Sequence, residues 1–462
     1  MNRKGQYIII AFSLLVLAVF VVSPAPTGLS TEAKNAIGIF ACAIILWITN
    51  ALPLSVTGLF VIALLPLLGV MPSKEAFALF GNSAVFFILG AFILAAAMIE
   101  TGLSKRIALL MLNKFDSTPR KLLAGIMLTC AFLSFIMPEH AVAAMMFPVV
   151  AAIANSLDLE KLNSNYGALL FLSLAWGAVI GGVGTLLGGA RNPLAIGLLK
   201  ESTGLEITFF EWMVAAMPIV FVMLAIAFVI LNLFLKMDIH TIKPAKEVLR
   251  SELVAVGKIT RAEKKAGCVM LLTVCSWIFI GNTIGLAVIA ILSAVLLFML
   301  NVLKWRDVES NVNWGIILMY GGAIAIGSAL ASTGAAEWAA MTVLDNITLT
   351  SVIVVLILPL IAIFLTEAIS NSACVAILIP IGFSIGDIVG ISPIIMVFLI
   401  AIPSGLAFIL PMGTPPNAIA YSAGYYTIRQ ILLPAFILNL TAWLVFIIMV
   451  FTYWPLIGIN II

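Results

Sequence analysis

The chain has 462 residues, of which 63% are hydrophobic and 9% are charged, and its formal net charge is +3. A soluble domain carries about 25% charged residues, so this composition cannot cover a surface that faces water. It excludes a soluble enzyme or binding module and predicts an all-α integral membrane protein.

Long apolar stretches follow one another along the chain. A helix needs about 20 apolar residues to cross a bilayer, and we expect about eleven transmembrane helices together with several shorter, interrupted segments. The clearest stretches lie at residues 7–22, 37–47, 56–68, 169–187, 209–235, 267–280, 353–364 and 431–451.

The basic residues are unevenly distributed. They gather before the first stretch, at residues 105–121, and at residues 236–265, where eight Lys or Arg face four Asp or Glu. By the positive-inside rule these regions are cytoplasmic. We therefore expect a multi-pass protein of the inner (plasma) membrane with a cytoplasmic N-terminus. The last region is expected to be an amphipathic linker along the inner face and not a nucleic-acid patch.

The five cysteines are scattered and odd in number, which argues against a disulfide framework, and the two histidines nearly exclude a histidine-based zinc site. We expect no organic cofactor and no nucleic-acid partner.

Several landmarks recur at a constant spacing. Thr101 and Gly102 lie 232 residues before Thr333 and Gly334, and a break at residues 138–140 lies 232 residues before one at residues 370–372. The chain is therefore predicted to be a duplication: a first half at 1–235, the linker at 236–265, and a second half at 266–462. An odd number of spans per half would give the inverted repeats of secondary transporters.

The two breaks interrupt apolar runs near their middles, and each half has a second glycine-rich break, at residues 188–192 and 413–417. Breaks at membrane depth free backbone groups that protein or a wet cavity must satisfy. We expect helices to restart at Ala141 and Ala373, so that two positive N-termini form an anion site. The carbonyls freed just before each break, with Ser, Thr and Asn oxygens, can ligate sodium. Without the repeat and the second break, residues 370–372 would also fit a polar contact between two neighbouring helices.

At these motifs the chain resembles the divalent-anion:sodium symporters, which carry dicarboxylates, citrate and sulfate. The resemblance covers nearly the whole chain. It implies a homodimer in which a scaffold holds a mobile transport domain with two re-entrant hairpins, working by an elevator-like movement. It also implies a Ser-Asn-Thr motif at each hairpin tip and a Gly-Thr-Pro-Pro-Asn-like loop in each half.

The resemblance assigns roles in the second half, which fits the family pattern well. The sodium ligands it implies are Thr366, Asn371 and the backbone of Ile369 and Gly413. The substrate-facing positions it implies there are Asn371, Ser372, Thr414 and Pro415.

The first half departs from the family pattern. Pro138-Glu139-His140 replaces Ser-Asn-Thr, and Arg191 appears in the second break, while Ser134 is retained. We expect Glu139, His140 and Arg191 to converge and to face the substrate. A second candidate cation or charge site comprises Ser134, Glu139, Gly188 and Arg191.

Two interpretations of this departure stay open. Glu139 and Arg191 can form an ion pair that only holds the tips together. Alternatively, Arg191 supplies the charge that sodium supplies elsewhere and His140 adds a titratable charge, which favours proton coupling or exchange. The substrate can then be a dicarboxylate, an inorganic oxyanion, a monocarboxylate or a zwitterion.

The function expected from these features is secondary active transport of small anions, with at most one family-like sodium site. A membrane-embedded enzyme is disfavoured, since Glu139 and His140 have no second histidine to support them. A channel is disfavoured because the polar residues gather at two closed tips. A proton antiporter or a metalloid-oxyanion exporter of related fold remains the rival.

Overall fold

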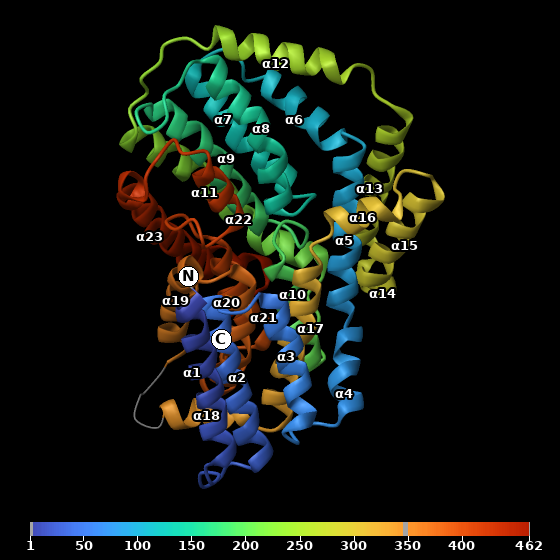
Figure 1. Ribbon diagram of the computed structural model, residues 1–462, viewed down its shortest axis with the longest axis vertical. Coiled ribbons are helices and arrows are strands. Elements are labelled where there is room, and N and C mark those ends of the chain that lie inside the picture. Colours follow the sequence, from blue (N-terminus) through green and yellow to red (C-terminus); the bar gives the residue numbers. More distant parts are fainter. Residues whose placement is uncertain (1–2, 345–349, 462) are drawn as a thin grey trace.

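The computed structural model describes residues 3–344 and 350–461, and within them the regular structure is entirely helical (Figure 1). Up to residue 235 the elements are α1 (Arg3–Val22), α2 (Thr31–Thr49), α3 (Leu54–Leu67), α4 (Ser73–Ala78), η1 (Leu79–Gly81), α5 (Ser83–Glu100), α6 (Leu103–Asn113), α7 (Pro119–Ser134), α8 (Glu139–Ser156), α9 (Asn165–Val183), α10 (Arg191–Thr203) and α11 (Phe209–Phe234).

The later elements are α12 (Lys243–Val256), α13 (Arg261–Phe279), α14 (Gly281–Ile284), α15 (Leu286–Met299), α16 (Trp305–Asn311), α17 (Trp314–Ser332), α18 (Ala335–Leu344), α19 (Ser351–Ala368), α20 (Asn371–Val389), α21 (Pro393–Ala401), η2 (Pro403–Gly405), α22 (Pro415–Ser422), α23 (Ile428–Thr452) and η3 (Trp454–Ile457).

Ten helices in the described part of the chain are long and apolar enough to cross a membrane. Three shorter apolar segments accompany them, at Leu54–Leu67, Leu286–Met299 and Pro393–Gly405. The all-helical membrane fold is thus confirmed. The expected count of about eleven spans differs from ten because some apolar runs form helices too short to cross alone.

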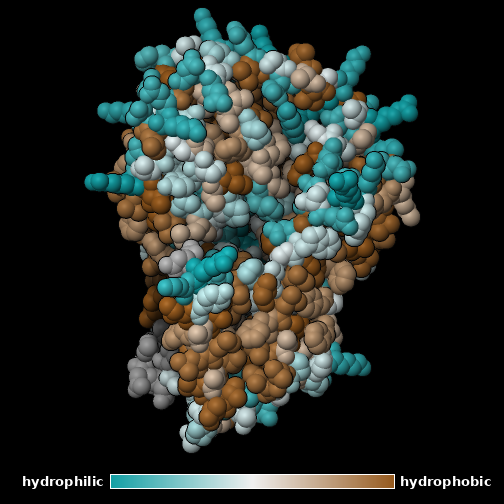
Figure 2. Space-filling view, viewed as in Figure 1, coloured by the Kyte–Doolittle hydropathy of each residue, from teal (hydrophilic) through white to brown (hydrophobic). Residues whose placement is uncertain are grey.

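The surface has the polarity that a membrane protein needs (Figure 2). Hydrophobic side chains cover much of the lower part of this face, over α1 to α3, and hydrophilic side chains gather at the upper end, near α12. Helix α1 is exposed along most of its length, and only Ser13 and Leu17 are buried. Its outer side chains are therefore not covered by the described part of this chain, and their apolar character suits contact with lipid.

Both predicted breaks end one helix and begin another, but the restarts come two residues earlier than Ala141 and Ala373. Helix α8 begins at Glu139 after Pro138, and α20 begins at Asn371 after Ser370. Pro138 and Ser370 have the extended ψ angles of N-cap residues, and the Ser370 side chain accepts a hydrogen bond from the Ala373 amide at 3.2 Å. Glu139 and Asn371 therefore occupy the first turns of helices, at the positive ends of their dipoles.

Helix α12 runs across the upper end of the molecule (Figure 1) and contacts α6 and α8. It forms much of the basic linker expected at residues 236–265. The last five of those residues, from Arg261 on, already belong to α13. The connection between α12 and α13 is tied to α6 by Arg106, whose guanidinium donates to both Glu263 carboxylate oxygens at 2.6 and 3.0 Å and to the Gly257 carbonyl at 2.7 Å.

Replacing Arg106 with alanine should therefore lower the free energy of unfolding by about 1.5–3 kcal/mol, since hydrogen bonds to a buried charged group are lost. The neighbouring Lys105 offers a matched control, because its ion pair with Glu252 is exposed. Lys105→Ala should cost less than about 1 kcal/mol. Thermal unfolding of both purified variants in detergent checks this, and equal losses would contradict it.

Candidate substrate and cation site

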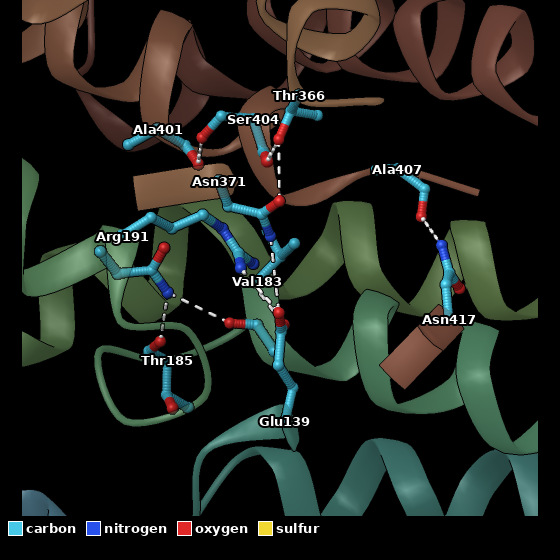
Figure 3. Close-up of polar contacts among 12 residues, drawn as sticks. Glu139, Val183, Thr185, Arg191, Thr366, Asn371, Ala401, Ser404, Ala407 and Asn417 are labelled. Atoms are coloured by element: carbon cyan, nitrogen blue, oxygen red, sulfur yellow. Dashed lines mark hydrogen bonds and ion pairs between the residues drawn. The ribbon is translucent and has the colours of Figure 1, made fainter. Parts of the chain in front are cut away.

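Two helical hairpins, α7–α8 and α19–α20, bring their tips together. The Asn371 side chain of the second tip lies 3.5 Å from Glu139 Oε1 of the first tip, although 232 residues separate them (Figure 3). The first turns of α8 and α20 thus meet inside the protein. This is the meeting of the two breaks that the sequence predicts.

The second breaks, between α9 and α10 and between α21 and α22, are held by asparagines. Asn192 Nδ2 donates to the carbonyls of Gly182 at 3.1 Å and Thr185 at 2.7 Å, and Asn417 Nδ2 donates to the Ala407 carbonyl at 3.0 Å. These side chains satisfy carbonyls that each break frees from helical bonding. Thr185 Oγ1 further donates to the Phe135 carbonyl at 2.8 Å, so the first break is fixed to the first hairpin.

Glu139 and Arg191 form a buried ion pair. Arg191 Nη1 lies 3.3 and 3.2 Å from the two carboxylate oxygens, and the residues are 1% and 5% exposed for Arg191 and Glu139. Glycines make room for this pair: a Cβ on Gly182 would collide with the Glu139 carboxylate, and one on Gly405 with the guanidinium. The pair has no net charge when Glu139 is ionised, so its burial does not leave a lone charge at membrane depth.

Arg191 uses only part of its hydrogen-bonding capacity. Its Nε and Nη2 are buried and have no protein partner among the described residues. An unpaired buried donor on a charged group is costly, so these two groups are suited to an incoming acceptor. A guanidinium presents its donors in a planar fork that matches a carboxylate or an oxyanion.

Nearby hydroxyls share this property. Ser134 Oγ and Thr414 Oγ1 are also buried without a hydrogen-bond partner in the described part of the chain. The carbonyl of Gly188 is already used, because it accepts from the Glu139 amide at 2.8 Å. A Cβ added at Gly188 would meet the Ser134 carbonyl, so the predicted group of Ser134, Glu139, Gly188 and Arg191 is contiguous. It contains a guanidinium, and its Gly188 carbonyl already accepts a hydrogen bond.

His140 lies apart from this group. Its ring meets Phe92 of α5 edge to face, with ring centroids 5.9 Å apart, whereas its neighbour Glu139 faces Arg191. Successive residues of a helix do not face the same side, so Glu139 and His140 cannot both point at Arg191 from the first turn of α8. The expected convergence of three ionisable residues thus reduces to Glu139 and Arg191.

Oxygen atoms converge at the second tip. Thr366 Oγ1 donates to the Ser404 carbonyl at 2.9 Å and lies 2.8 Å from one end of the Asn371 amide, which is 2.9 Å from the Gly413 carbonyl. Ile369 ends α19 in an extended conformation and is 1% exposed. The donor set consists of neutral hydroxyl, carbonyl and amide oxygens, which suits a small hard cation such as sodium. Ser404 was not predicted, and no sequence signal marks its carbonyl.

The Asn371 amide is assigned with Nδ2 toward Thr366 and Gly413. In that orientation its Oδ1 accepts from Arg191 Nη1 at 3.0 Å and Nδ2 donates to Thr366 Oγ1 and to the Gly413 carbonyl, and these three contacts outweigh the longer 3.5 Å approach of Oδ1 to Glu139 Oε1. Figure 3 draws the opposite orientation, in which Nδ2 faces the Arg191 donor and only the 3.5 Å contact with Glu139 compensates. Asn371 thereby connects the oxygens that suit a sodium ion, those of Thr366 and Gly413, with the Arg191 guanidinium.

The other substrate-facing positions differ in exposure. Ser372 and Thr414 are 9% and 1% exposed, and Pro415 is exposed at the start of α22. Two hydroxyls are therefore close to the first turns of α20 and α22, where backbone N–H groups have no partner within the helix.

Glu367 has a structural task beside this site. Its carboxylate accepts hydrogen bonds from the amides of Phe408, Ile409 and Leu410 at 2.6, 2.9 and 2.8 Å, and from Asn439 Nδ2 at 2.7 Å. These bonds satisfy the freed backbone groups ahead of Gly413. The loop that carries Gly413 and Thr414 is thereby fixed to the end of α19.

A family model described as the sodium:sulfate symporter transmembrane region matches residues 4–460. The chain belongs to the sodium:sulfate symporter family. This membership confirms the resemblance to divalent-anion:sodium symporters and makes the protein a multi-pass membrane transporter and not an enzyme.

Within the family, the chain is similar to two sodium-dependent dicarboxylate transporters, both called SdcS. The protein of Staphylococcus saprophyticus is 30% identical over 458 residues, and that of Staphylococcus aureus strain USA300 is 29% identical over 456 residues. Each alignment covers 92% of this chain and 88% of the relative.

Two solved structures share the fold of this sodium:sulfate symporter family member. The antimetabolite efflux pump MtrF of Neisseria gonorrhoeae has a TM-score of 0.57 at 14% identity, with 97% of this chain and 95% of that chain covered. The YdaH transporter of Alcanivorax borkumensis has a TM-score of 0.56 at 13% identity, with 97% of each chain covered. At such identities the likeness concerns the fold alone.

Proposed function

We propose that the protein is a secondary active transporter of small anions in which Arg191 replaces the cation of the first half. The observation that carries this is the buried guanidinium of Arg191, which bonds Glu139 from the first hairpin and Asn371 from the second. Its Nε and Nη2 have no protein partner among the described residues and are the donors proposed to hold the anion.

The arrangement of the helices supports an inverted repeat. Helices α2 to α8 begin 230–232 residues before α13 and α15 to α20, taken in order. Helix α6 lies near the upper end of the molecule and its counterpart α18 near the lower end (Figure 1). Two opposed hairpins that meet at their tips suit a carrier with alternating access around a central site. We propose the same homodimeric, elevator-type organisation as the family resemblance implies.

The distribution of charge supports the orientation. The basic linker with α12 lies at the upper end (Figure 1), which we propose as the cytoplasmic side of the plasma membrane. We propose the N-terminus on the same side because Arg3 and Lys4 precede the first apolar stretch, although in Figure 1 the described part of the chain begins near mid-height.

The substrate that suits the site is a small dicarboxylate-like or inorganic oxyanion. Arg191 offers planar donors, and Ser372 and Thr414 offer hydroxyls beside two helix N-termini. The relatives' names, sodium-dependent dicarboxylate transporter, favour the dicarboxylate. The Glu139 carboxylate would repel an anion, but its pairing with Arg191 offsets that charge.

Coupling is proposed to use at most one sodium ion, co-transported at Thr366, Ile369, Asn371 and Gly413. A second candidate is a proton-coupled or exchange-type carrier, favoured by the Glu139–Arg191 pair at the place where the family binds a cation. The positive charge of Arg191 cannot leave the carrier with the substrate. A carrier whose only cationic charge is built in is therefore balanced only when an anion is bound, so it crosses the membrane more readily loaded than empty, as exchange requires.

Uptake of labelled succinate and sulfate into proteoliposomes tests the proposal. A sodium gradient should drive uptake with a simple hyperbolic dependence on sodium. Uptake driven only by anion inside the vesicles would favour exchange, and uptake driven by a proton gradient would favour proton coupling. A steep dependence on two or more sodium ions without a pH effect would contradict the proposal.

A further inference from the structure

The Asn371 amide has two chemically different neighbourhoods. One end lies 2.8 Å from Thr366 Oγ1 and 2.9 Å from the Gly413 carbonyl oxygen. The other end lies 3.0 Å from Arg191 Nη1 and 3.5 Å from Glu139 Oε1. The first neighbourhood contains oxygens only, and the second contains the guanidinium at the shorter distance and the Glu139 carboxylate at the longer one.

Without a cation, nitrogen belongs at the first end. Thr366 Oγ1 donates its proton to the Ser404 carbonyl at 2.9 Å, so it presents lone pairs to Asn371. The Gly413 carbonyl also presents lone pairs. An amide oxygen only 2.9 Å from that carbonyl would be repelled, whereas Nδ2 donates to both neighbours.

A cation reverses this preference. A sodium ion bound by Thr366 and Gly413 needs the oxygen of Asn371 at the first end, because an amide nitrogen is not a ligand for a hard cation. Nδ2 then points at Arg191 Nη1, donor against donor, and Arg191 loses its 3.0 Å hydrogen bond to Oδ1, while Nδ2 gains only the longer 3.5 Å contact with Glu139 Oε1. The cation and the guanidinium thus require the same oxygen atom.

We propose that Asn371 couples the two halves of the site through rotation of its amide, so that sodium and Arg191 compete for Oδ1. This inference rests on the proposed sodium site of the second half. An anion that draws the guanidinium away from Asn371 raises sodium affinity, and sodium raises anion affinity by the same factor. Asn371 is in this sense a positioning residue for coupled transport as well as a ligand.

The test is the sodium dependence of thermal unfolding of the full-length protein in detergent, with choline as the control cation. The neutral pair of substitutions Glu139→Gln and Arg191→Gln removes the competitor without leaving a lone buried charge. Sodium should then bind about tenfold more tightly than in the wild type, since a hydrogen bond to a charged group is worth about a factor of ten or more.

Asn371→Asp is the complementary variant, because an aspartate presents oxygen at both ends and ends the competition. In that background the same neutral pair should change sodium affinity by less than about twofold. Arg191→Lys is a further variant for the case in which the neutral pair does not fold, since the shorter lysine keeps the charge but withdraws the Nη1 contact. It should also tighten sodium binding.

A folded variant without the Arg191 contact whose sodium affinity equals that of the wild type would overturn the inference. An equal gain from the neutral pair in the wild-type background and in the Asn371→Asp background would overturn it too, because the effect would then not pass through the amide. If sodium stabilises neither the wild type nor any variant beyond choline, the proposed sodium site itself fails, which is a distinct result.

Discussion

Replacing Arg191 with glutamine is expected to abolish anion uptake and to destabilise the protein strongly. The substitution removes the buried donors proposed to hold the anion and leaves the Glu139 carboxylate, 5% exposed, without its counter-charge. Breaking a buried ion pair from one side costs about 3–5 kcal/mol, because the remaining charge is uncompensated. Uptake into proteoliposomes and the melting temperature in detergent measure the two effects.

The neutral double variant, Glu139→Gln with Arg191→Gln, separates transport from stability. Most of the lost stability should return, because no buried charge remains unpaired, while uptake should stay absent because no fixed positive charge is present. Wild-type uptake by the double variant would show that the ion pair only holds the hairpin tips together.

Replacing Glu367 with alanine is expected to be the most destabilising single change away from Arg191. Four donors bond its carboxylate, three of them backbone amides of the Phe408–Leu410 segment. Each buried donor left unsatisfied costs about 1–3 kcal/mol, so the total loss should be several kcal/mol even if water reaches part of the site. The melting temperature and its rise with sodium should both fall, since the loop that carries Gly413 loses its attachment.

Glu211→Ala is a suitable control for this change. Glu211 also accepts a hydrogen bond from a backbone amide, that of Thr208 at 2.8 Å, but it lies at an exposed helix N-terminus. Glu211 is the N3 residue of a capping box, and loss of one such exposed hydrogen bond costs about 0.5–1.5 kcal/mol. A Glu367→Ala variant no less stable than Glu211→Ala would contradict the structural task assigned to Glu367.

Much of the fold and part of the site could be predicted because they depend on strong local signals. Apolar runs of spanning length specify helices in a bilayer, Pro138 cannot continue the preceding helix without cost, and Ser370 caps the start of the next one. The constant spacing of the breaks then identified the two residues, Glu139 and Asn371, that meet at the tips. We expected the second helices of the hairpins to begin at Ala141 and Ala373, two residues too late, because the N-cap residue and not the first apolar residue sets where a helix begins.

The rest depends on three-dimensional arrangements that a linear pattern does not contain. His140 follows Glu139 in sequence, yet the turn of α8 directs its ring toward Phe92. The space for the Glu139–Arg191 pair depends on Gly182 and Gly405, from distant segments. Pairing between Arg106 and Glu263 similarly joins residues 157 positions apart.

The number of sodium ions moved per anion tests the central claim most directly. It can be measured in proteoliposomes from the sodium gradient that just balances a given anion gradient at zero membrane potential. If Arg191 occupies the role of the first-half cation, no more than one sodium ion accompanies each anion. Two or more sodium ions per anion would show that both halves bind sodium and that Arg191 does not replace one of them.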